Sequence, residues 1–339
     1  MKTDYAIEVQ NLTKKFGDFM AVDNLSLNVE NNEIFGFLGP NGAGKSTTIR
    51  MLCTLAQPTS GSAKVAGYDL IKDSSKVREN IGLVAEKMIM YDRLTAAENL
   101  RFFGKLYAIP KQKLEERIDE LLELVNMREW KHTQISKYST GMKQRINVIR
   151  ALLPEPEIIF MDEPTLGLDP QTTFSIREII RDINQDGVTV ILTTHAMTEA
   201  EALSDHVAII DHGKIAALDT PQNLKNMISN NDTTIFTTKI MNLTSKLVEK
   251  IKMLEEVTAV GQQDDYNLKI SAKGSDALNR IIDTVRNEGG NIASVINSNE
   301  STLEDVFLTV TGKEMRDQAK EKSNPIQHRH GQAPTSRVR

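Results

Sequence analysis

A glycine-rich segment that ends in lysine and serine has the residue types that bind phosphate. Residues 39–46 read Gly-Pro-Asn-Gly-Ala-Gly-Lys-Ser and match the spacing G-x-x-x-x-G-K-[ST]. Glycines let the backbone turn so that successive N–H groups point inward, and the positive end of a following helix adds to their attraction for an anion. We therefore expect a cradle for the phosphates of a nucleotide. Its predicted residues are Gly39, Pro40, Asn41, Gly42, Ala43, Gly44, Lys45, Ser46 and Thr47.

Two side chains of this phosphate loop have individual roles in the prediction. The ammonium group of Lys45 is expected to reach the β and γ phosphates, and the hydroxyl of Ser46 is expected to bind Mg²⁺. A glycine-rich turn can match this spacing by chance. Here an apolar run precedes the segment and a helical pattern starts at Thr47, which is the context that the motif requires.

An acidic pair, Asp162 and Glu163, follows the apolar run at residues 158–161. The carboxylate of Asp162 can complete a magnesium shell, and Glu163 is placed to accept a proton from an attacking water. Alone, an apolar run that ends in Asp-Glu also fits a strand that runs into a turn. Together with the phosphate loop, the pair predicts hydrolysis of a nucleotide.

Short apolar runs alternate with longer helical patterns through the first 230 or so residues, which predicts an α/β fold with a largely parallel sheet. The pattern between residues 95 and 153 is helical throughout and opens with a capping box formed by Thr95 and Glu98. We expect an inserted helical subdomain there. The candidate buried strands are residues 33–38, 81–85, 157–161, 188–193 and 206–211.

A second folded unit is predicted after the polar run at residues 229–233. Its patterns follow the order βαββαβ of the ferredoxin-like motif, and a second capping box, Ser301 to Glu304, is expected to start a final helix that ends near Gly312. The predicted strands are 234–240, 257–261, 266–272 and 291–298, and the predicted helices are 242–255 and 275–288. We therefore expect a nucleotide-binding α/β domain at 1–229, an α+β accessory domain at 230–312 and a disordered tail at 313–339.

Composition excludes several classes of function. The formal net charge of −5 argues against a main partner that is nucleic acid. A lone cysteine, Cys53, fits a reducing compartment, and the N-terminus lacks the pattern of a secretory signal. No run approaches about 18 apolar residues. We expect a cytoplasmic protein, so that any membrane it serves must be spanned by another chain.

Three further motifs give the chain a resemblance to a known family. Residues 138–145 read Tyr-Ser-Thr-Gly-Met-Lys-Gln-Arg, residues 167–170 read Gly-Leu-Asp-Pro, and His195 follows the apolar run at 188–194. These segments resemble the signature motif, the D-loop and the switch histidine of ABC ATPases, and they stand in the family's order relative to the phosphate loop and the acidic pair. The resemblance covers residues 4 to about 228.

The resemblance implies an ABC-type core in which two copies of the chain bind ATP head to tail as a homodimer or pseudo-dimer. Each phosphate loop then faces the other copy's signature motif, here Ser139 and Gly141, and Asp169 of the D-loop is among the implied nucleotide-binding residues. Ser139 also suits a helix N-cap, which is its ordinary interpretation. Glu163 is the implied general base, and His195 is implied to contact the γ-phosphate.

Three positions are less regular. Phe16 lies where the family has an aromatic residue that stacks on adenine, although Phe19 or a role in the core is an alternative. Glu86 replaces the usual glutamine that contacts Mg²⁺ and senses the permease. Its carboxylate is still a candidate ligand of Mg²⁺, but its added negative charge near the phosphates puts coupling in doubt. Thr140 replaces a usual glycine of the signature motif, and its β-branched side chain predicts slower turnover.

The C-terminal segment 301–312 resembles the ending of ATPase subunits of ABC-2 type exporters, the daunorubicin-resistance group. This implies a subunit that binds and hydrolyses ATP to energise an integral membrane permease, with export of drugs, lipids, glycans or ions. Its place would be the inner face of the membrane, with the permease contact near residues 86–100 and the helical subdomain. The rival interpretations are a soluble ABC ATPase of ribosomes or nucleic acid and a non-catalytic nucleotide-binding scaffold. The accessory domain would serve as a dimer contact or a small-ligand module.

Overall fold

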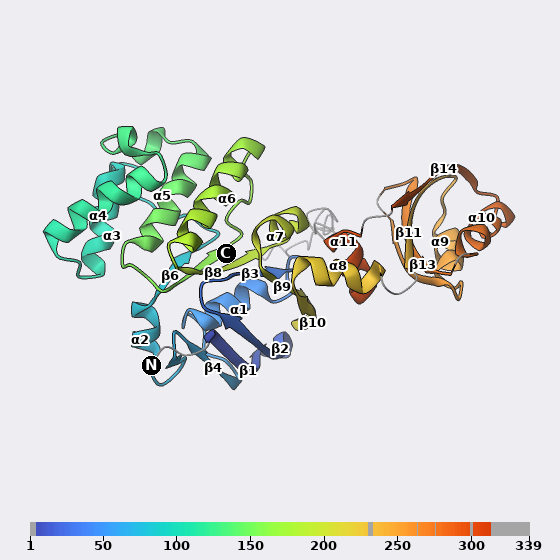
Figure 1. Cartoon of the computed structure of the whole chain (residues 1–339), viewed down its shortest axis with the longest axis horizontal. Coiled ribbons are helices and arrows are strands. Elements are labelled where there is room, and N and C mark those ends of the chain that lie inside the picture. Colours follow the sequence, from blue (N-terminus) through green and yellow to red (C-terminus); the bar gives the residue numbers. More distant parts are fainter. Residues whose placement is uncertain (1–4, 230–232, 263, 275, 299–300, 313–339) are drawn as a thin grey trace, which may run out of the picture.

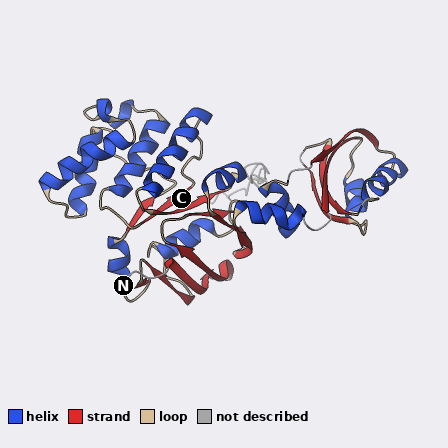
Figure 2. Ribbon diagram, viewed as in Figure 1, coloured by secondary structure: helices blue, strands red, loops and turns tan. Residues whose placement is uncertain are grey.

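The computed structural model describes residues 5–312, apart from 230–232, 263, 275 and 299–300. The predicted disordered tail at 313–339 lies outside the described residues, as does most of the polar run at 229–233. Three sheets organise the described chain: a six-stranded sheet at its centre, a four-stranded sheet beneath it and a separate four-stranded sheet near the C-terminus (Figures 1 and 2). Within the described ranges, no helix is long and apolar enough to cross a membrane.

The central sheet has the strand order β10-β9-β3-β8-β7-β6. All neighbouring strands are parallel except β10, which is antiparallel to β9. Both faces are covered, because successive residues of β7 pack into different apolar clusters: Ile159 with the helices of one face and Phe160 with α1 and the lower sheet. The bounds are β3 Ile34–Leu38, β6 Ile81–Val84, β7 Ile158–Asp162, β8 Thr189–Thr194, β9 His206–Asp211 and β10 Lys214–Asp219. The predicted parallel sheet is confirmed. Five of its strands differ by at most one residue at each end from the predicted ranges, and β10 was not among the candidate strands.

The lower sheet was not among the candidate strands. It is antiparallel with the order β2-β1-β4-β5, and β1 and β2 form a long hairpin whose register is broken at several points by bulges. Its strands are partly exposed and polar, which is why no apolar run marks them. Helix α1, Lys45–Leu52, lies between this sheet and the central one (Figure 1). The bounds are β1 Tyr5–Phe16, β2 Phe19–Glu30, β4 Ser60–Val65 and β5 Tyr68–Asp69, followed by helix α2 at Ser74–Glu79.

A group of helices covers the other face of the central sheet and extends beyond it (Figure 1). Helix α3, Ala96–Leu106, begins with the predicted capping box of Thr95 and Glu98. Helix α4, Lys111–Leu124, buries Leu114, Ile118, Leu121 and Leu122 on one face. Short 3₁₀ turns at Arg128–Trp130 and Ile135–Lys137 lead to α5, Thr140–Leu152, and α6 follows at Pro170–Gln185.

The C-terminal sheet has the order β12-β13-β11-β14, and all its neighbouring strands are antiparallel. The elements follow one another as β-α-β-β-α-β, the order expected from the sequence, and two helices pack against the sheet to form a separate apolar cluster. In Figure 1 this unit lies apart from the other two sheets. The bounds are β11 Thr233–Met241, α9 Ser245–Lys252, β12 Val257–Gln262, β13 Asn267–Lys273, α10 Ala277–Asn287 and β14 Asn291–Ser298.

The last helix, α11 at Leu303–Thr311, returns to the central sheet. Its Leu303, Val306 and Phe307 are buried with residues of β3, β9, α7 (Met197–Leu203) and α8 (Pro221–Ser229). The predicted capping box at Ser301 and Glu304 is wrong by one position, because Thr302 is the N-cap and Asp305 closes the box. The carboxylate of Asp305 also pairs with the ammonium of Lys269 in β13 at 2.7 Å, which ties the C-terminal sheet to α11.

Candidate functional site

The phosphate loop connects the buried strand β3 to helix α1, as the sequence predicted. Two of its glycines are needed by the backbone itself. Gly44 has φ +112°, and a Cβ there would stand 2.6 Å from the carbonyl oxygen of Ala21. A Cβ on Gly39 would stand 2.3 Å from the carbonyl oxygen of Ile210. The loop is therefore wedged between neighbouring backbone segments, and only glycine fits at these two positions.

Lys45 is 5% exposed and lies at the centre of the site. Its Nζ donates to the carbonyl oxygen of Gly39 at 2.6 Å and stands 3.4 Å from Oε1 of Glu163. Burial lowers the pKa of Lys45, and the nearby carboxylates of Glu163, Asp162 and Glu86 act against that shift. This buried cation has few solvent partners, so it is poised to pair with an anion that enters the loop.

The hydroxyl of Ser46 and the carboxylate of Asp162 meet where β7 ends. Ser46 Oγ donates to Asp162 Oδ1 at 2.9 Å, and Thr193 Oγ1 donates to the same oxygen at 2.6 Å. Both Ser46 and Asp162 offer hard oxygen donors, which is the chemistry Mg²⁺ prefers. In the described part of the chain, no group of three or more His, Cys, Asp or Glu side chains could hold a metal alone. This donor set suits a magnesium ion that is also held by the phosphates of its nucleotide.

Glu163 and His195 are brought together from two neighbouring strands, β7 and β8. His195 Nδ1 lies 2.8 Å from Glu163 Oε2. The side chain of Glu163 is 9% exposed, and its other oxygen faces Lys45. Glu163 is the first residue after the end of β7, and its φ of +51° lies in the left-handed region. The site thus forms a chain of side chains, Lys45 to Glu163 to His195, along the carboxyl edge of the parallel sheet, where ligands bind in open α/β folds.

The signature residues lie at the exposed start of helix α5. Ser139 is the N-cap, and its hydroxyl accepts from the backbone N–H of Met142 at 3.2 Å. Gly141 packs against α6 of the same chain, where a Cβ would stand 2.4 Å from Cγ2 of Thr172. Asp169 caps α6, accepting from Thr172 N at 3.0 Å and from Thr172 Oγ1 at 2.6 Å. The signature helix and the D-loop helix therefore contact each other within one chain.

Two predicted site residues stand outside this cluster. Glu86 is exposed beyond the end of β6, and no hydrogen bond in the described ranges joins it to Ser46 or Asp162. Phe16 is 53% exposed at the tip of the β1–β2 hairpin, with Lys14 Nζ 4.8 Å from its ring centroid. Phe19, the alternative to Phe16, is its strand partner across the turn and is 63% exposed. Both rings are therefore available to a base.

Several side chains that hold the site were not singled out from the sequence. Thr193, Thr194 and Glu199 are buried polar residues at the end of β8 and in α7. Their signal in the sequence was weak: a polar Thr-Thr pair closes an apolar run, and a glutamate stands four residues after His195. Gln144 of α5 was also missed, although its side-chain amide donates to the carbonyl oxygen of Pro164 at 2.7 Å.

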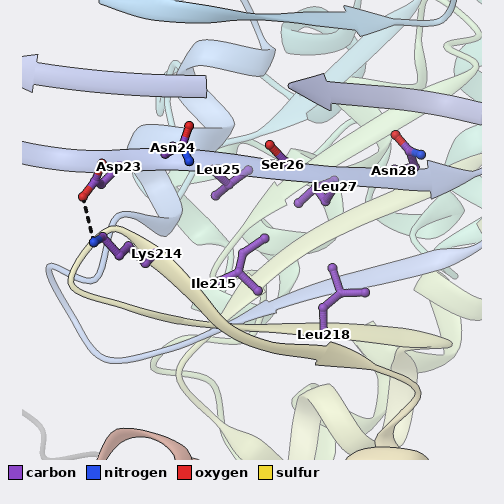
Figure 3. Close-up of a pocket in the computed structure, with 9 residues that line it drawn as sticks. All are labelled: Asp23, Asn24, Leu25, Ser26, Leu27, Asn28, Lys214, Ile215 and Leu218. Atoms are coloured by element: carbon purple, nitrogen blue, oxygen red, sulfur yellow. Dashed lines mark ion pairs between the residues drawn. The ribbon is translucent and has the colours of Figure 1, made fainter. Parts of the chain in front are cut away.

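An apolar groove of about 690 Å³ lies elsewhere, between strands β2 and β10 (Figure 3). Leu25, Leu27, Ile215 and Leu218 point into it, and an ion pair between Asp23 and Lys214 at 3.1 Å stands at one end. None of the predicted site residues lines this groove. The groove is therefore not part of the nucleotide site predicted from the sequence.

Comparisons with known proteins agree with this geometry. A family model for the ABC transporter ATP-binding domain matches residues 22–166. The chain is 36% identical to the linearmycin resistance ATP-binding protein LnrL of Bacillus subtilis over 92% of its own length and 100% of that protein. It is 33% identical to the daunorubicin resistance ATP-binding protein DrrA3 of Streptomyces coeruleorubidus over 92% of this chain and 98% of that protein. The Nod factor export ATP-binding protein I of Cupriavidus metallidurans is 33% identical over 92% of this chain and 99% of its own.

Solved structures match the ATPase part of the fold. The dimeric post-hydrolysis structure of the ATP-binding cassette MJ0796, bound to ADP and Pi, aligns with a TM-score of 0.57 and 27% identity over 63% of this chain and 98% of that one. The ATP-binding subunit of another ABC transporter aligns with a TM-score of 0.59 and 28% identity over 66% of this chain and 92% of that one. With relatives that match it over nearly their full length, and with the phosphate loop, the acidic pair and His195 at one sheet edge, the chain belongs to the family of ABC transporter ATP-binding proteins.

Proposed function

We propose that this protein binds and hydrolyses ATP to drive an export permease in the membrane. The observation that carries the proposal is the cluster of Lys45, Glu163 and His195 beside the Ser46–Asp162 pair. It combines a cation for phosphate, a base for water and oxygen donors for a metal. A scaffold that only bound nucleotide would have no need of the partly buried Glu163–His195 pair.

The side chains have separate tasks in this reaction. The loop N–H groups and Lys45 bind the phosphates, and Lys45 exchanges its bond to the Gly39 carbonyl for bonds to the nucleotide. Glu163 accepts the proton of the attacking water, and His195 orients that water and the γ-phosphate. Mg²⁺ held by Ser46 and Asp162 would neutralise phosphate charge. Phe16 would stack on the adenine ring, as its exposed face allows.

A second copy of the chain completes the site in this proposal. Ser139 and Thr140 are exposed at the N-terminus of α5, so the N–H groups of that helix end are accessible to a partner's nucleotide. Asp169 is likewise exposed at the start of α6. ATP would join two chains by bridging the phosphate loop of one and the signature helix of the other, and hydrolysis would release them.

The permease would dock on an exposed apolar surface next to the helical subdomain. Five large side chains of segment 89–107 are 39–68% exposed. They are Ile89, Tyr91, Phe102, Leu106 and Tyr107. Clustered aromatic residues of this kind are typical of protein interfaces. The position next to Glu86 would let the permease sense the nucleotide site and would hold the protein at the inner face of the membrane.

The class of cargo follows from the relatives. Two of them are named for resistance to linearmycin and daunorubicin and a third for export of Nod factor. These names support export of a small compound, such as a drug, by this protein and its permease.

The test is recovery of the permease with the full-length protein. Tagged Glu163→Gln protein, loaded with ATP and Mg²⁺, would be incubated with solubilised membranes of the source cell, and bound proteins would be identified by mass spectrometry. We expect a polytopic membrane protein, and we expect its loss with a Tyr91→Glu and Phe102→Glu variant. Recovery of ribosomes or nucleic-acid proteins instead would contradict the transporter assignment and leave the ATPase assignment in place.

A further inference from the structure

Glu199 is a buried carboxylate that the proposed reaction does not use. It stands in the first turn of α7 and is 1% exposed. Burial raises the pKa of Glu199, while hydrogen bonds from Thr194 and Thr165 and the charge of Arg177 act against that shift. A carboxylate with no access to solvent is costly unless hydrogen bonds compensate it. The hydrogen-bond partners of Glu199 therefore indicate which segments of the chain this residue holds in place.

Glu199 and its hydroxyl partner belong to the two segments that carry the reacting pair. Thr165 Oγ1 donates to Glu199 Oε1 at 2.7 Å, and Thr165 stands two residues after Glu163. Glu199 stands four residues after His195, in the helix α7 that follows it. The Glu199 carboxylate thus joins the turn after the proposed base to the helix after the switch histidine.

Other hydrogen bonds also fix these segments: the Glu163 N–H donates to the Thr193 carbonyl oxygen at 3.1 Å, and His195 Nδ1 lies 2.8 Å from Glu163 Oε2. The Thr194 carbonyl oxygen accepts from the N–H of Gly39 at 3.3 Å, so the strand end is also joined to the phosphate loop. On the opposite side, Gln144 binds the carbonyl oxygen of Pro164. The turn at residues 163–166 is therefore held by α5 on one side and by Glu199 on the other, and it continues directly into the D-loop.

We propose that Glu199 is a positioning residue of the ATPase: by binding Thr165, it holds the turn after Glu163 against the helix after His195 and so keeps Glu163 and His195 in the arrangement that hydrolysis requires. The inference rests on the roles of Glu163 and His195 proposed above. Glu199 acts through Thr165, because it is 1% exposed and its Oε1 accepts the threonine hydroxyl. It acts on the chemical step and not on ATP affinity, since the phosphate loop binds ATP through other groups.

The test removes one hydrogen bond without changing the shape of the core. Thr165→Val replaces the hydroxyl with a methyl group, whereas Thr165→Ser keeps the hydroxyl. We expect Thr165→Val to lower kcat by about tenfold, with KM for ATP within about twofold of the wild-type value. Thr165→Ser should restore most of kcat. Glu199→Gln, which keeps one acceptor oxygen, should also lower kcat, and the double variant with Thr165→Val should lose less than the product of the single losses.

Controls separate this inference from the proposed function. Thr165→Val should bind a fluorescent ATP analogue as tightly as the wild type and should still unfold in a single thermal transition, at a somewhat lower temperature because Glu199 loses a hydrogen bond; these results would exclude loss of the fold or of the nucleotide site. Equal kcat in wild type, Thr165→Val and Thr165→Ser would overturn the role of Glu199, and so would a rise in KM at constant kcat. Turnover by Glu163→Gln at the wild-type rate would instead overturn the role of the base, whatever the threonine variants do.

Discussion

The substitution Gly141→Ala should have a clear effect, because Gly141 lies where the signature helix α5 contacts the D-loop helix α6. A methyl group at this position would stand 2.4 Å from Cγ2 and 3.0 Å from Oγ1 of Thr172. Thr172 cannot easily move away, since its hydroxyl and its backbone N–H both bind the carboxylate of Asp169. Gly141→Ala must therefore push α6 from α5 or disturb the cap of α6.

The size of the effect follows from the overlap. An ordinary contact between carbon atoms is about 3.5–4.0 Å, so the two helices must separate by roughly 1 Å or the threonine must leave its rotamer. Insertion of a methyl group into a packed contact of this kind costs about 1–3 kcal/mol. We expect the melting temperature to fall by roughly 2–4 °C for each kcal/mol. Because Ser139 and Asp169 both lie at this contact, turnover should fall as well.

Thermal unfolding of the full-length protein measures this cost, and Thr172→Ser supplies the matched background. Serine removes Cγ2 but keeps the hydroxyl that binds Asp169. We expect Gly141→Ala to cost distinctly less in the Thr172→Ser background than in the wild type, with Thr172→Ser alone as the control. The same loss in both backgrounds, or no loss in either, would refute the contact between the two helices as the cause.

Four other predictions follow from the structure. Lys269→Met leaves the buried carboxylate of Asp305 unpaired and should cost about 3–5 kcal/mol in denaturant unfolding. The pKa of Glu199 is raised in the fold, so wild-type stability falls as pH rises from the unfolded pKa near 4.5 through the folded pKa. The stability of Glu199→Gln relative to the wild type, measured by unfolding from pH 5 to 7, should therefore increase with pH. Thr140→Gly should raise ATP turnover, and unchanged or lower turnover counts against a steric cost. Lys45→Ala should weaken ATP binding in a direct titration, and normal affinity contradicts the phosphate role.

The grouping of Lys45, Glu163 and His195 could be predicted because its signals are local in the sequence. The phosphate loop, the acidic pair and His195 each follow a short buried strand, and parallel strands place their carboxyl ends at one edge. Predicting the strands therefore also placed Lys45, Glu163 and His195 together. In the structure, the side chains of Glu163 and His195 lie within hydrogen-bonding distance of each other.

Other features depend on partners far away in the sequence. The strands of the lower sheet are polar and half-exposed, so they had no apolar run to reveal them. The sequence predicted helix α11 as the end of the accessory domain, whereas in the structure its apolar face packs with α7 and α8 at the central sheet. Glu199 and Thr165 lie 34 positions apart, and only the fold shows that they share a hydrogen bond. Long-range contacts of this kind leave no pattern in a single sequence.

The dimer formed by Glu163→Gln protein tests the central claim most directly. Light scattering coupled to size-exclusion chromatography would measure the mass of the full-length variant with and without saturating ATP and Mg²⁺, and Glu163→Gln combined with Lys45→Ala would serve as the control. We expect a monomer of 37.9 kDa without nucleotide, a dimer with ATP and a monomer in the control. A monomer at saturating ATP, or a dimer that forms without nucleotide and in the Lys45→Ala control, would contradict the claim that ATP joins two copies of this chain.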